Sequence, residues 1–281
     1  MIKNILAKFV TYFHYEKVLD SLIYDKWQNN PLAKGILAPA SYYQKIYNGV
    51  SRKTYPLIKS FEKSEGYAID VEWFNNLAFH TQVVKKEVEI NYQHGRVLYT
   101  LLREYIKKSK SKFVNILETG TARGFSSLCM AKALDDAKVF GRILTIDVLP
   151  HNSPIYWNCV DDAKGVRTRK KLLEKYNELT DKYITFLQAY SEIGLKRIET
   201  GRIYFAYLDG QHTFDAVLAE AEYVADRQKK GDVIVFDDYD REFFSGVVAA
   251  VDTFAKKRNY TRKLYRGEID TSRFYVEAIK R

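Results

Sequence analysis

The chain has 281 residues, 46% of them hydrophobic, and a formal net charge of +10. This length allows one large domain with a substantial core, and no stretch reaches the roughly 20 apolar residues that a membrane-spanning helix needs. The two cysteines, Cys129 and Cys159, fit a reducing compartment, so we expect a cytoplasmic protein, without a cleaved leader. The charge is compatible with nucleic acid, an anionic membrane or an acidic substrate. No RNA-binding signature accompanies it, so we do not expect nucleic acid as a partner.

The N-terminal third, residues 1–110, is predicted to be a helical extension of the domain formed by residues 111–281. Between residues 2 and 23 apolar side chains recur at helical spacing, with lysines among them. This pattern predicts a helix that packs on its own domain or on the partner subunit of a homodimer, and peripheral contact with a membrane is the alternative. Residues 31–69 are Tyr-rich and are expected to be irregular.

Two further helices are expected before residue 111. Asp70 is typical of an N-cap, which places one helix from there to about Val84. The second is expected from about Gly95 to Lys107. Basic residues gather from Lys107 to Lys112 and again at 167–171, and a solvated basic face accounts for both clusters without a partner.

From Phe113 onwards, short apolar runs alternate with amphipathic segments. The expected strands are 113–118, 142–147, 183–188, 203–209, 232–236, 262–264 and 274–279. The expected helices are 125–137, 164–179, 192–199, 213–229 and 243–258. This alternation predicts an α/β fold with a mostly parallel seven-stranded sheet and helices on both faces. Ligands of such sheets bind beyond the carboxyl ends of the strands.

A glycine-containing turn follows the first of these strands, which ends in Glu118. Gly120 and Gly124 permit a sharp turn and a close approach to a ligand. A dinucleotide-binding turn needs G-x-G-x-x-G, whereas here an acid precedes the first glycine. That acid would repel a pyrophosphate but accept hydrogen bonds from a cationic amino-acid group. Asp147, at the end of the second strand, is placed to bind both hydroxyls of a ribose.

Three carboxylates follow two later strands, Asp209 after one and the pair Asp237 and Asp238 after the next. They should converge at one edge of the sheet, and buried unpaired carboxylates are costly, so such a cluster usually holds a cation. Ligands that are all oxygen favour Mg²⁺ before Ca²⁺ or Mn²⁺. The alternative is that one aspartate merely caps the next helix, and that His212 is a residue of a helix N-terminus.

These segments resemble the class I S-adenosylmethionine-dependent methyltransferases. From residue 113 to about 258, D-G-x-H-x-[FY] and G-D-V-I-V-F-D-D are similar to the metal-dependent O-methyltransferase branch, in particular the macrocin-type sugar O-methyltransferases from antibiotic pathways. The resemblance implies a Rossmann-like fold, S-adenosyl-L-methionine as cofactor, and a divalent cation at Asp209, Asp237 and Asp238. The candidate cofactor contacts are Glu118, Gly120, Thr121, Gly124, Ser126, Ser127, Asp147, Ala189, Tyr190, Ser191 and Asp209. The family often has Gly-Asp at positions 189 and 190 and an acid at position 211, where this chain has Ala-Tyr and Gln.

Methyl transfer from a sulfonium is an in-line displacement, and a hydroxyl is a poor nucleophile near neutral pH. A cation would bind the acceptor oxygen and lower its pKa. His212 is the expected base, with Asp209 as its catalytic partner; in the alternative, His212 only orients Asp209. The segment after Asp147 is expected to wall the acceptor site or to form a hydrophobic plug. The candidate substrate contacts are Tyr156, Trp157, Asn158 and Tyr239.

We therefore expect an enzyme that methylates a hydroxyl of a sugar, a glycan precursor or a secondary metabolite. RNA methylation is one alternative, and its sign would be binding that weakens steeply with salt. A non-catalytic protein that keeps the cofactor fold is the other. That protein would bind the cofactor without metal dependence or turnover.

Overall fold

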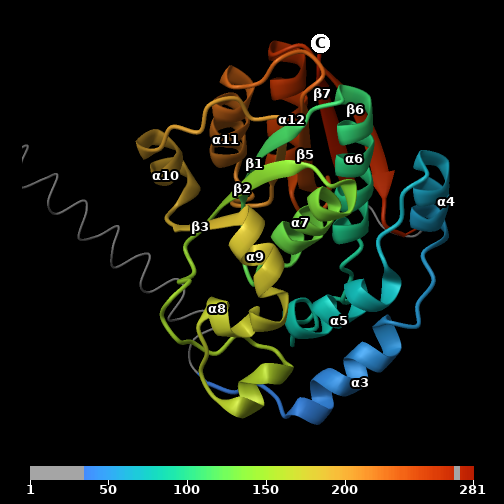
Figure 1. The fold of residues 1–281 in the computed structure, drawn as a ribbon, viewed down its shortest axis with the longest axis vertical. Coiled ribbons are helices and arrows are strands. Elements are labelled where there is room, and N and C mark those ends of the chain that lie inside the picture. The colour runs from blue at the N-terminus through green and yellow to red at the C-terminus, as the bar shows by residue number, and fades with distance from the viewer. Residues whose placement is uncertain (1–34, 269–272) are drawn as a thin grey trace, which may run out of the picture.

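The computed structural model describes residues 35–268 and 273–281, and its seven strands form one sheet in the order β3-β2-β1-β4-β5-β7-β6 (Figure 1). The strands are β1 Phe113–Thr119, β2 Phe140–Asp147, β3 Ile184–Gln188, β4 Phe205–Leu208, β5 Val233–Tyr239, β6 Tyr260–Arg266 and β7 Phe274–Lys280. Strands β1 to β5 pair in parallel, and β7 runs antiparallel to both β5 and β6. The predicted Rossmann-like sheet is confirmed.

Helices cover both faces of this sheet (Figure 1). They are α3 Ala40–Val50, α4 Pro56–Glu65, α5 Val71–Thr81, α6 His94–Ser109, α7 Phe125–Ala137, α8 Arg169–Leu172, α9 Asn177–Tyr183, α10 Ser191–Arg197, α11 Phe214–Asp226 and α12 Ser245–Lys257, with short 3₁₀ turns η1 Val160–Lys164 and η2 Glu174–Tyr176. Among the described residues, none of these helices has the length and apolar content that crossing a membrane requires.

Two apolar cores lie on the two faces of the sheet, because successive side chains of a strand point to opposite faces. Ile116 belongs to the core shared with α4 to α7, and its neighbour Leu117 belongs to the core shared with α11 and α12. The first core thus contains residues from both sides of position 110. The division of the chain into domains at that position stays a prediction.

Residues 31–69 were expected to be irregular, but within their described part the structure has α3 and α4. Two prolines stand at the starts of these helices. Pro39 is the N-cap of α3, and Pro56 is the first residue of α4, where a fixed φ and a missing N–H are tolerated. Asp70 caps α5 as predicted, accepting a hydrogen bond from the Trp73 amide at 2.7 Å. The helix expected within residues 1–30 lies outside the described residues.

The single helix expected at 164–179 is wrong. Gly165, with a φ of 88°, ends η1, and the backbone of Arg167 then pairs with Ile155 in an isolated bridge. Thr168 starts α8 by accepting a hydrogen bond from the Lys171 amide. The extended backbone at Arg167 interrupts the helical pattern, so the region folds as short turns.

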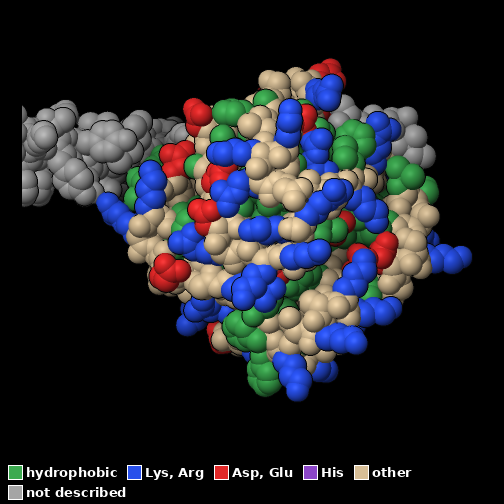
Figure 2. All heavy atoms as spheres, turned by 90° about the horizontal axis from the view of Figure 1, so that it is seen from above, with side chains coloured by type: hydrophobic (Ala, Val, Ile, Leu, Met, Phe, Trp, Pro, Cys, Tyr) green, Lys and Arg blue, Asp and Glu red, His purple; other side chains and the backbone are tan. Residues whose placement is uncertain are grey.

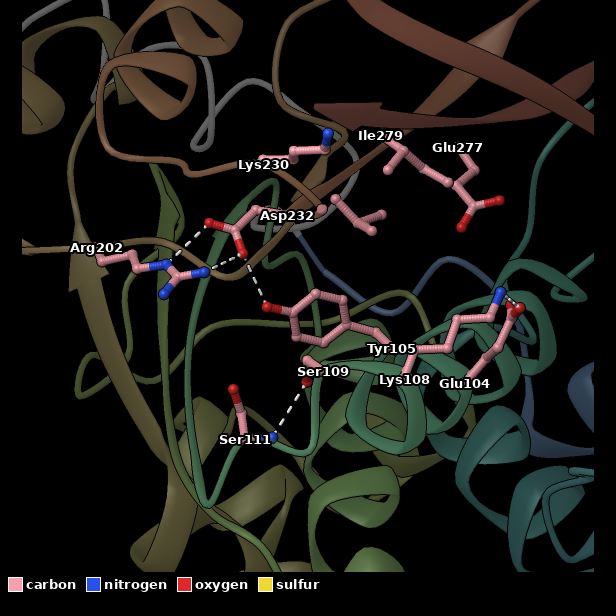
Figure 3. A pocket seen from close by; sticks show the side chains of 12 residues that line it. Glu104, Tyr105, Lys108, Ser109, Ser111, Arg202, Lys230, Asp232, Glu277 and Ile279 are labelled. Atoms are coloured by element: carbon pink, nitrogen blue, oxygen red, sulfur yellow. Dashed lines mark hydrogen bonds and ion pairs between the residues drawn. The ribbon is translucent and has the colours of Figure 1, made fainter. Parts of the chain in front are cut away.

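A buried carboxylate links α6 to the amino end of β5 (Figure 3). The Asp232 carboxylate is fully buried, and it accepts hydrogen bonds from the Tyr105 hydroxyl at 2.8 Å and from two nitrogens of Arg202 at 2.8 and 3.0 Å. Because each oxygen has a partner, the buried charge is satisfied. Asp232 and its two partners lie at the edge of the sheet opposite the carboxyl ends of the strands.

Candidate active site

The glycine turn after β1 brings the ends of two strands into contact. Gly120 has a φ of 89°, and a Cβ added there would lie 1.9 Å from the carbonyl oxygen of Asp209 at the end of β4. Gly124, with a φ of 91°, is the N-cap of α7. No residue with a side chain fits at Gly120 without displacing the backbone of Asp209. The turn is therefore built for the close approach that the sequence predicts.

Asp147 closes this turn from the end of β2. Its Oδ2 accepts a hydrogen bond from the Ala122 amide and its Oδ1 one from the Leu149 amide, both at 2.7 Å. The Asp147 backbone carbonyl accepts from the Ala189 amide at 2.9 Å, which places the segment 189–191 beside it. The carboxylate remains partly exposed at the carboxyl edge of the sheet. These predicted cofactor residues thus lie together.

Glu118 is fully buried below the same turn. Its carboxylate accepts hydrogen bonds from the hydroxyls of Ser126 and Ser127 in the first turn of α7. Burial raises the pKa of Glu118, and these hydroxyls oppose the rise. The nearby Thr121 hydroxyl pairs with that of Thr145 at 2.6 Å. Glu118 therefore ties β1 to α7. The predicted cofactor residues Ser126 and Ser127 both bind Glu118.

A second cluster stands at the ends of β4 and β5. The Nε2 atom of His212 lies 2.9 Å from Oδ2 of Asp238 and 3.5 Å from Oδ1 of Asp209. One donor atom from each of the three residues can be chosen so that all lie within 4.8 Å of one another. The hydrogen bonds to Asp209 and Asp238 raise the pKa of His212 to about 10. Its imidazole is therefore protonated near neutral pH in this arrangement.

Asp237, predicted as a third metal ligand, is held elsewhere. Its side chain is 1% exposed, its Oδ2 accepts from the Tyr207 hydroxyl at 2.5 Å, and its Oδ1 accepts from Nη2 of Arg273 at 2.5 Å. Burial alone would raise the pKa of Asp237, but the Arg273 guanidinium holds it below the usual range. The structure therefore brings together Asp209 and Asp238 with His212, and it leaves Asp237 out of that group.

The candidate substrate residues do not form one surface. Trp157 is completely buried beside Leu149, and its indole N–H donates to the Arg167 carbonyl at 2.7 Å, as the plug alternative expects. The Asn158 side chain is buried too: its amide oxygen accepts a hydrogen bond from the Lys85 N–H, and its amide nitrogen donates to the Lys85 carbonyl.

The other two substrate candidates lie apart from each other. Tyr156 stays partly exposed in the segment after β2. The Tyr239 hydroxyl donates to Asp252 of α12 at 2.8 Å, so it points away from the cluster at Asp238.

Comparison with known proteins agrees with this geometry. Residues 117–239 match a family model described as a methyltransferase domain. This segment runs from the end of β1 to the end of β5 and is similar to a methyltransferase domain. The cofactor-bound protein Rv0187 from MTB has a similar fold, with a TM-score of 0.53 and 17% identity over 82% of this chain and 99% of that one. The O-methyltransferase NovP gives a TM-score of 0.52 and 15% identity over 70% of this chain and 83% of that one. No curated protein matches the sequence.

A cavity of about 650 Å³ lies beside Asp238. It lies between the segment that precedes α6, the link from β5 to α12, and the ends of β6 and β7. Phe243 at its rim is 71% exposed, and the Phe244 ring lies 4.7 Å from that of His212. Sequence reasoning missed this wall, although two adjacent phenylalanines soon after Asp237 and Asp238 were a visible signal.

Sequence reasoning also missed two buried charged residues beside the predicted cofactor contacts. Arg169 is 2% exposed and donates to the carbonyls of Ala122 and Leu149 at 2.9 and 3.1 Å, so it joins the two segments that Asp147 also joins. Burial lowers the pKa of Arg169 to about 10.

Glu220 accepts hydrogen bonds from Thr119 and Ser191, which links the end of β1 to the start of α10. A glutamate within the apolar stripe of α11 was a signal for it, because a buried charge needs partners.

Proposed function

We propose that this protein is an S-adenosylmethionine-dependent O-methyltransferase, assisted by a divalent cation, that acts on a hydroxyl of a sugar, a glycan precursor or a secondary metabolite. The observation that carries the proposal is the group Asp209, His212 and Asp238 at the carboxyl edge of the sheet. This group adjoins both the glycine turn and the cavity of about 650 Å³. The similar fold of NovP, an O-methyltransferase, supports it.

The donor atoms present fit a cation, but not the set expected from the sequence. Ligands of a hexacoordinate ion with bonds of about 2.1 Å lie roughly 3 to 4 Å apart, which the spacing of Asp209, His212 and Asp238 allows with small shifts. An imidazole among two carboxylates suits Mn²⁺ at least as well as Mg²⁺. We therefore propose Mn²⁺ or Mg²⁺ at these three residues. A bound cation would supply Lewis acidity, lowering the pKa of the acceptor hydroxyl.

The chain's own residues have the remaining tasks. Asp147 presents a partly exposed carboxylate to a ribose, while the amides of Ala122 and Leu149 hold it in place. The cavity admits the acceptor, with Phe243 as an apolar wall and Asn91 and Lys86 as hydrogen-bond donors. His212 is either a ligand of the cation or the base that takes the hydroxyl proton. In either role it must first lose the proton that Asp209 and Asp238 stabilise on it.

Manganese titration followed by electron paramagnetic resonance tests the proposed ion directly, without an acceptor. We expect one site in the wild type that is lost in Asp238→Asn and in Asp209→Asn. S-adenosylhomocysteine titration of Asp238→Asn is the control, and we expect its affinity to change less than about threefold because Asp147 and Asp209 are intact. Cofactor binding in a wild type that has no manganese site would contradict the metal assistance while leaving the methyltransferase proposal standing.

A further inference from the structure

Two phenylalanines protrude side by side at the amino edge of the sheet, opposite the active site. Phe113 starts β1 and Phe140 starts β2, and their Cα atoms are register partners in the parallel pair. Phe113 is 47% exposed and Phe140 is 76% exposed. Single exposed apolar residues are common, but two large rings beside each other form a patch that water solvates poorly.

Basic residues flank this pair. Lys110 is the C-cap of α6 and Lys138 the C-cap of α7, with φ values of 52° and 55°, so both helix-to-strand turns have the same form, a left-handed lysine followed by an exposed phenylalanine. Lysine near a helix C-terminus also complements the helix dipole, but that does not account for the exposed rings. We call this surface the basic–aromatic edge; its residues are Lys107, Lys110, Lys112, Phe113, Lys138, Phe140 and Arg142, each of them exposed.

The nearby acids do not neutralise the edge. Glu104 pairs with Lys108, and Asp136 pairs with Lys132. Asp135 pairs with Lys182 at 2.8 Å and lies 3.8 Å from Lys138. Within residues 35–268 and 273–281, Lys110 and Lys112 have no ion-pair partner. The edge therefore has a net positive charge.

The wider surface has the same character. β7 runs antiparallel to β5, so the C-terminus lies at the amino edge, which is the top of Figure 1. Figure 2 looks down on this face and shows many more Lys and Arg than Asp and Glu side chains. A cavity of about 470 Å³ opens here as well, but Glu104, Asp232 and Glu277 line it with the basic groups, and its charges largely pair with one another (Figure 3). An anionic partner would thus meet the protruding edge and not this cavity.

We propose that the basic–aromatic edge docks the protein on the surface of an anionic lipid membrane. The rings of Phe113 and Phe140 enter the interface between headgroups and acyl chains, and the surrounding lysines meet the anionic headgroups. Single-stranded nucleic acid, the other polyanion, is bound in a basic groove whose aromatic faces stack on bases. Here the rings protrude from an edge, and the methyl-donor site is at the opposite end of the strands.

Docking in this way has a geometric consequence. The carboxyl ends of β1, β4 and β5, with Asp209 and the cavity, then face away from the bilayer. An acceptor therefore reaches the active site from the aqueous side. The proposal does not depend on the reaction that the site performs.

The test is sedimentation of the full-length protein with vesicles of phosphatidylcholine alone and of phosphatidylcholine with phosphatidylglycerol. We expect binding only to the anionic vesicles. The variant Lys110→Glu with Lys112→Glu should bind at least about tenfold more weakly, since each basic residue near such a surface contributes a factor of about five. Phe113→Ser with Phe140→Ser should also weaken binding severalfold. The matched control is Lys59→Glu with Lys63→Glu, the same charge change on exposed positions of α4, which should bind like the wild type.

A second measurement does not depend on loss of binding. In Phe140→Trp, the added indole fluorescence should shift to shorter wavelength on anionic vesicles and be quenched by lipids brominated in the acyl chain. Equal vesicle binding by the wild type and both edge variants would overturn the proposal. So would a Phe140→Trp signal that stays the same on vesicles. Loss of binding to a single-stranded RNA oligonucleotide in the lysine variant, with no vesicle binding by the wild type, would assign the edge to nucleic acid instead.

Discussion

The guanidinium of Arg273, just before β7, lies against the carboxylate of Asp237 in β5, with Nη2 2.5 Å and Nε 3.1 Å from the same oxygen. The Nε atom is also 2.9 Å from Asp238. One side chain therefore neutralises part of the acidic cluster from the far side of the cavity. The most buried carboxylate of the cluster has a fixed partner within the protein, and the more accessible ones face His212.

Arg273→Ala should destabilise the protein by about 3 kcal/mol, because it leaves the buried Asp237 carboxylate without its charged partner. Arg262→Ala is the control, since Arg262 pairs with Asp252 on the surface, where such a pair contributes at most about 1 kcal/mol. Urea denaturation of both variants measures the difference. Equal losses would show that the Arg273 pair is not a buried one in solution.

Gly120→Ala should cost more stability than Gly66→Ala, although both glycines have a positive φ. At Gly66 a Cβ meets nothing within 4 Å, so only the conformational cost of about 1 kcal/mol remains. At Gly120 the Cβ would overlap the Asp209 carbonyl and push the ends of β1 and β4 apart. We expect Gly120→Ala to lower the free energy of unfolding by at least about 3 kcal/mol and to abolish cofactor binding. Thermal melting and S-adenosylhomocysteine titration check both, and similar melting of the two variants would contradict the contact.

Glu220→Gln tests the buried carboxyl beside the cofactor region. Burial raises the pKa of Glu220 to about 7 in the folded protein, against the usual 4.5. Between these two pH values the folded state binds more protons than the unfolded state, so the free energy of unfolding falls as the pH rises. The loss reaches about 3 kcal/mol above pH 7.

Glutamine has no such titration. We therefore expect the free energy of unfolding of Glu220→Gln to rise relative to that of the wild type by up to about 3 kcal/mol between about pH 5 and about pH 8. Urea denaturation at the two pH values measures this gain. A wild type and a variant with the same dependence on pH would show that Glu220 ionises normally.

His212→Ala should lower turnover by about 100-fold or more, while the affinity for S-adenosylhomocysteine changes less than about threefold. Manganese binding then separates the two proposed roles. A base can be lost without loss of the ion, whereas loss of a ligand also weakens manganese binding. Asp215→Ala, at an exposed position of the same segment, is the control and should behave like the wild type. Unchanged turnover in His212→Ala would remove this residue from the mechanism.

The sheet could be predicted from the sequence because each parallel strand is a short apolar run between helical segments. The same periodicity placed Asp147 and Asp209 at strand ends, where the structure has them near the glycine turn. Asp70 was recognisable as a cap because its partner is only three residues away. These features depend on neighbours in the chain, and local patterns report such neighbours well.

The rest depends on contacts between distant segments. The partner of Asp237 is 36 residues away, just before an antiparallel strand, and the β5–β7 register shifts between Phe236 and Tyr239, where Asp238 has a φ of 52°. A sequence pattern does not show such a shift, so it cannot tell which of two adjacent aspartates faces His212. The burial of Trp157 was equally hard to predict, because it depends on apolar residues brought together by a long connection.

The most direct test of the central claim is calorimetric titration of S-adenosylmethionine into the wild type and Asp147→Ala, with NAD as the control ligand. We expect S-adenosylmethionine to bind the wild type, Asp147→Ala to weaken this binding by at least about tenfold through the lost ribose contacts, and NAD to give no signal. Binding of NAD in place of S-adenosylmethionine would contradict the interpretation of the glycine turn, and with it the proposed function.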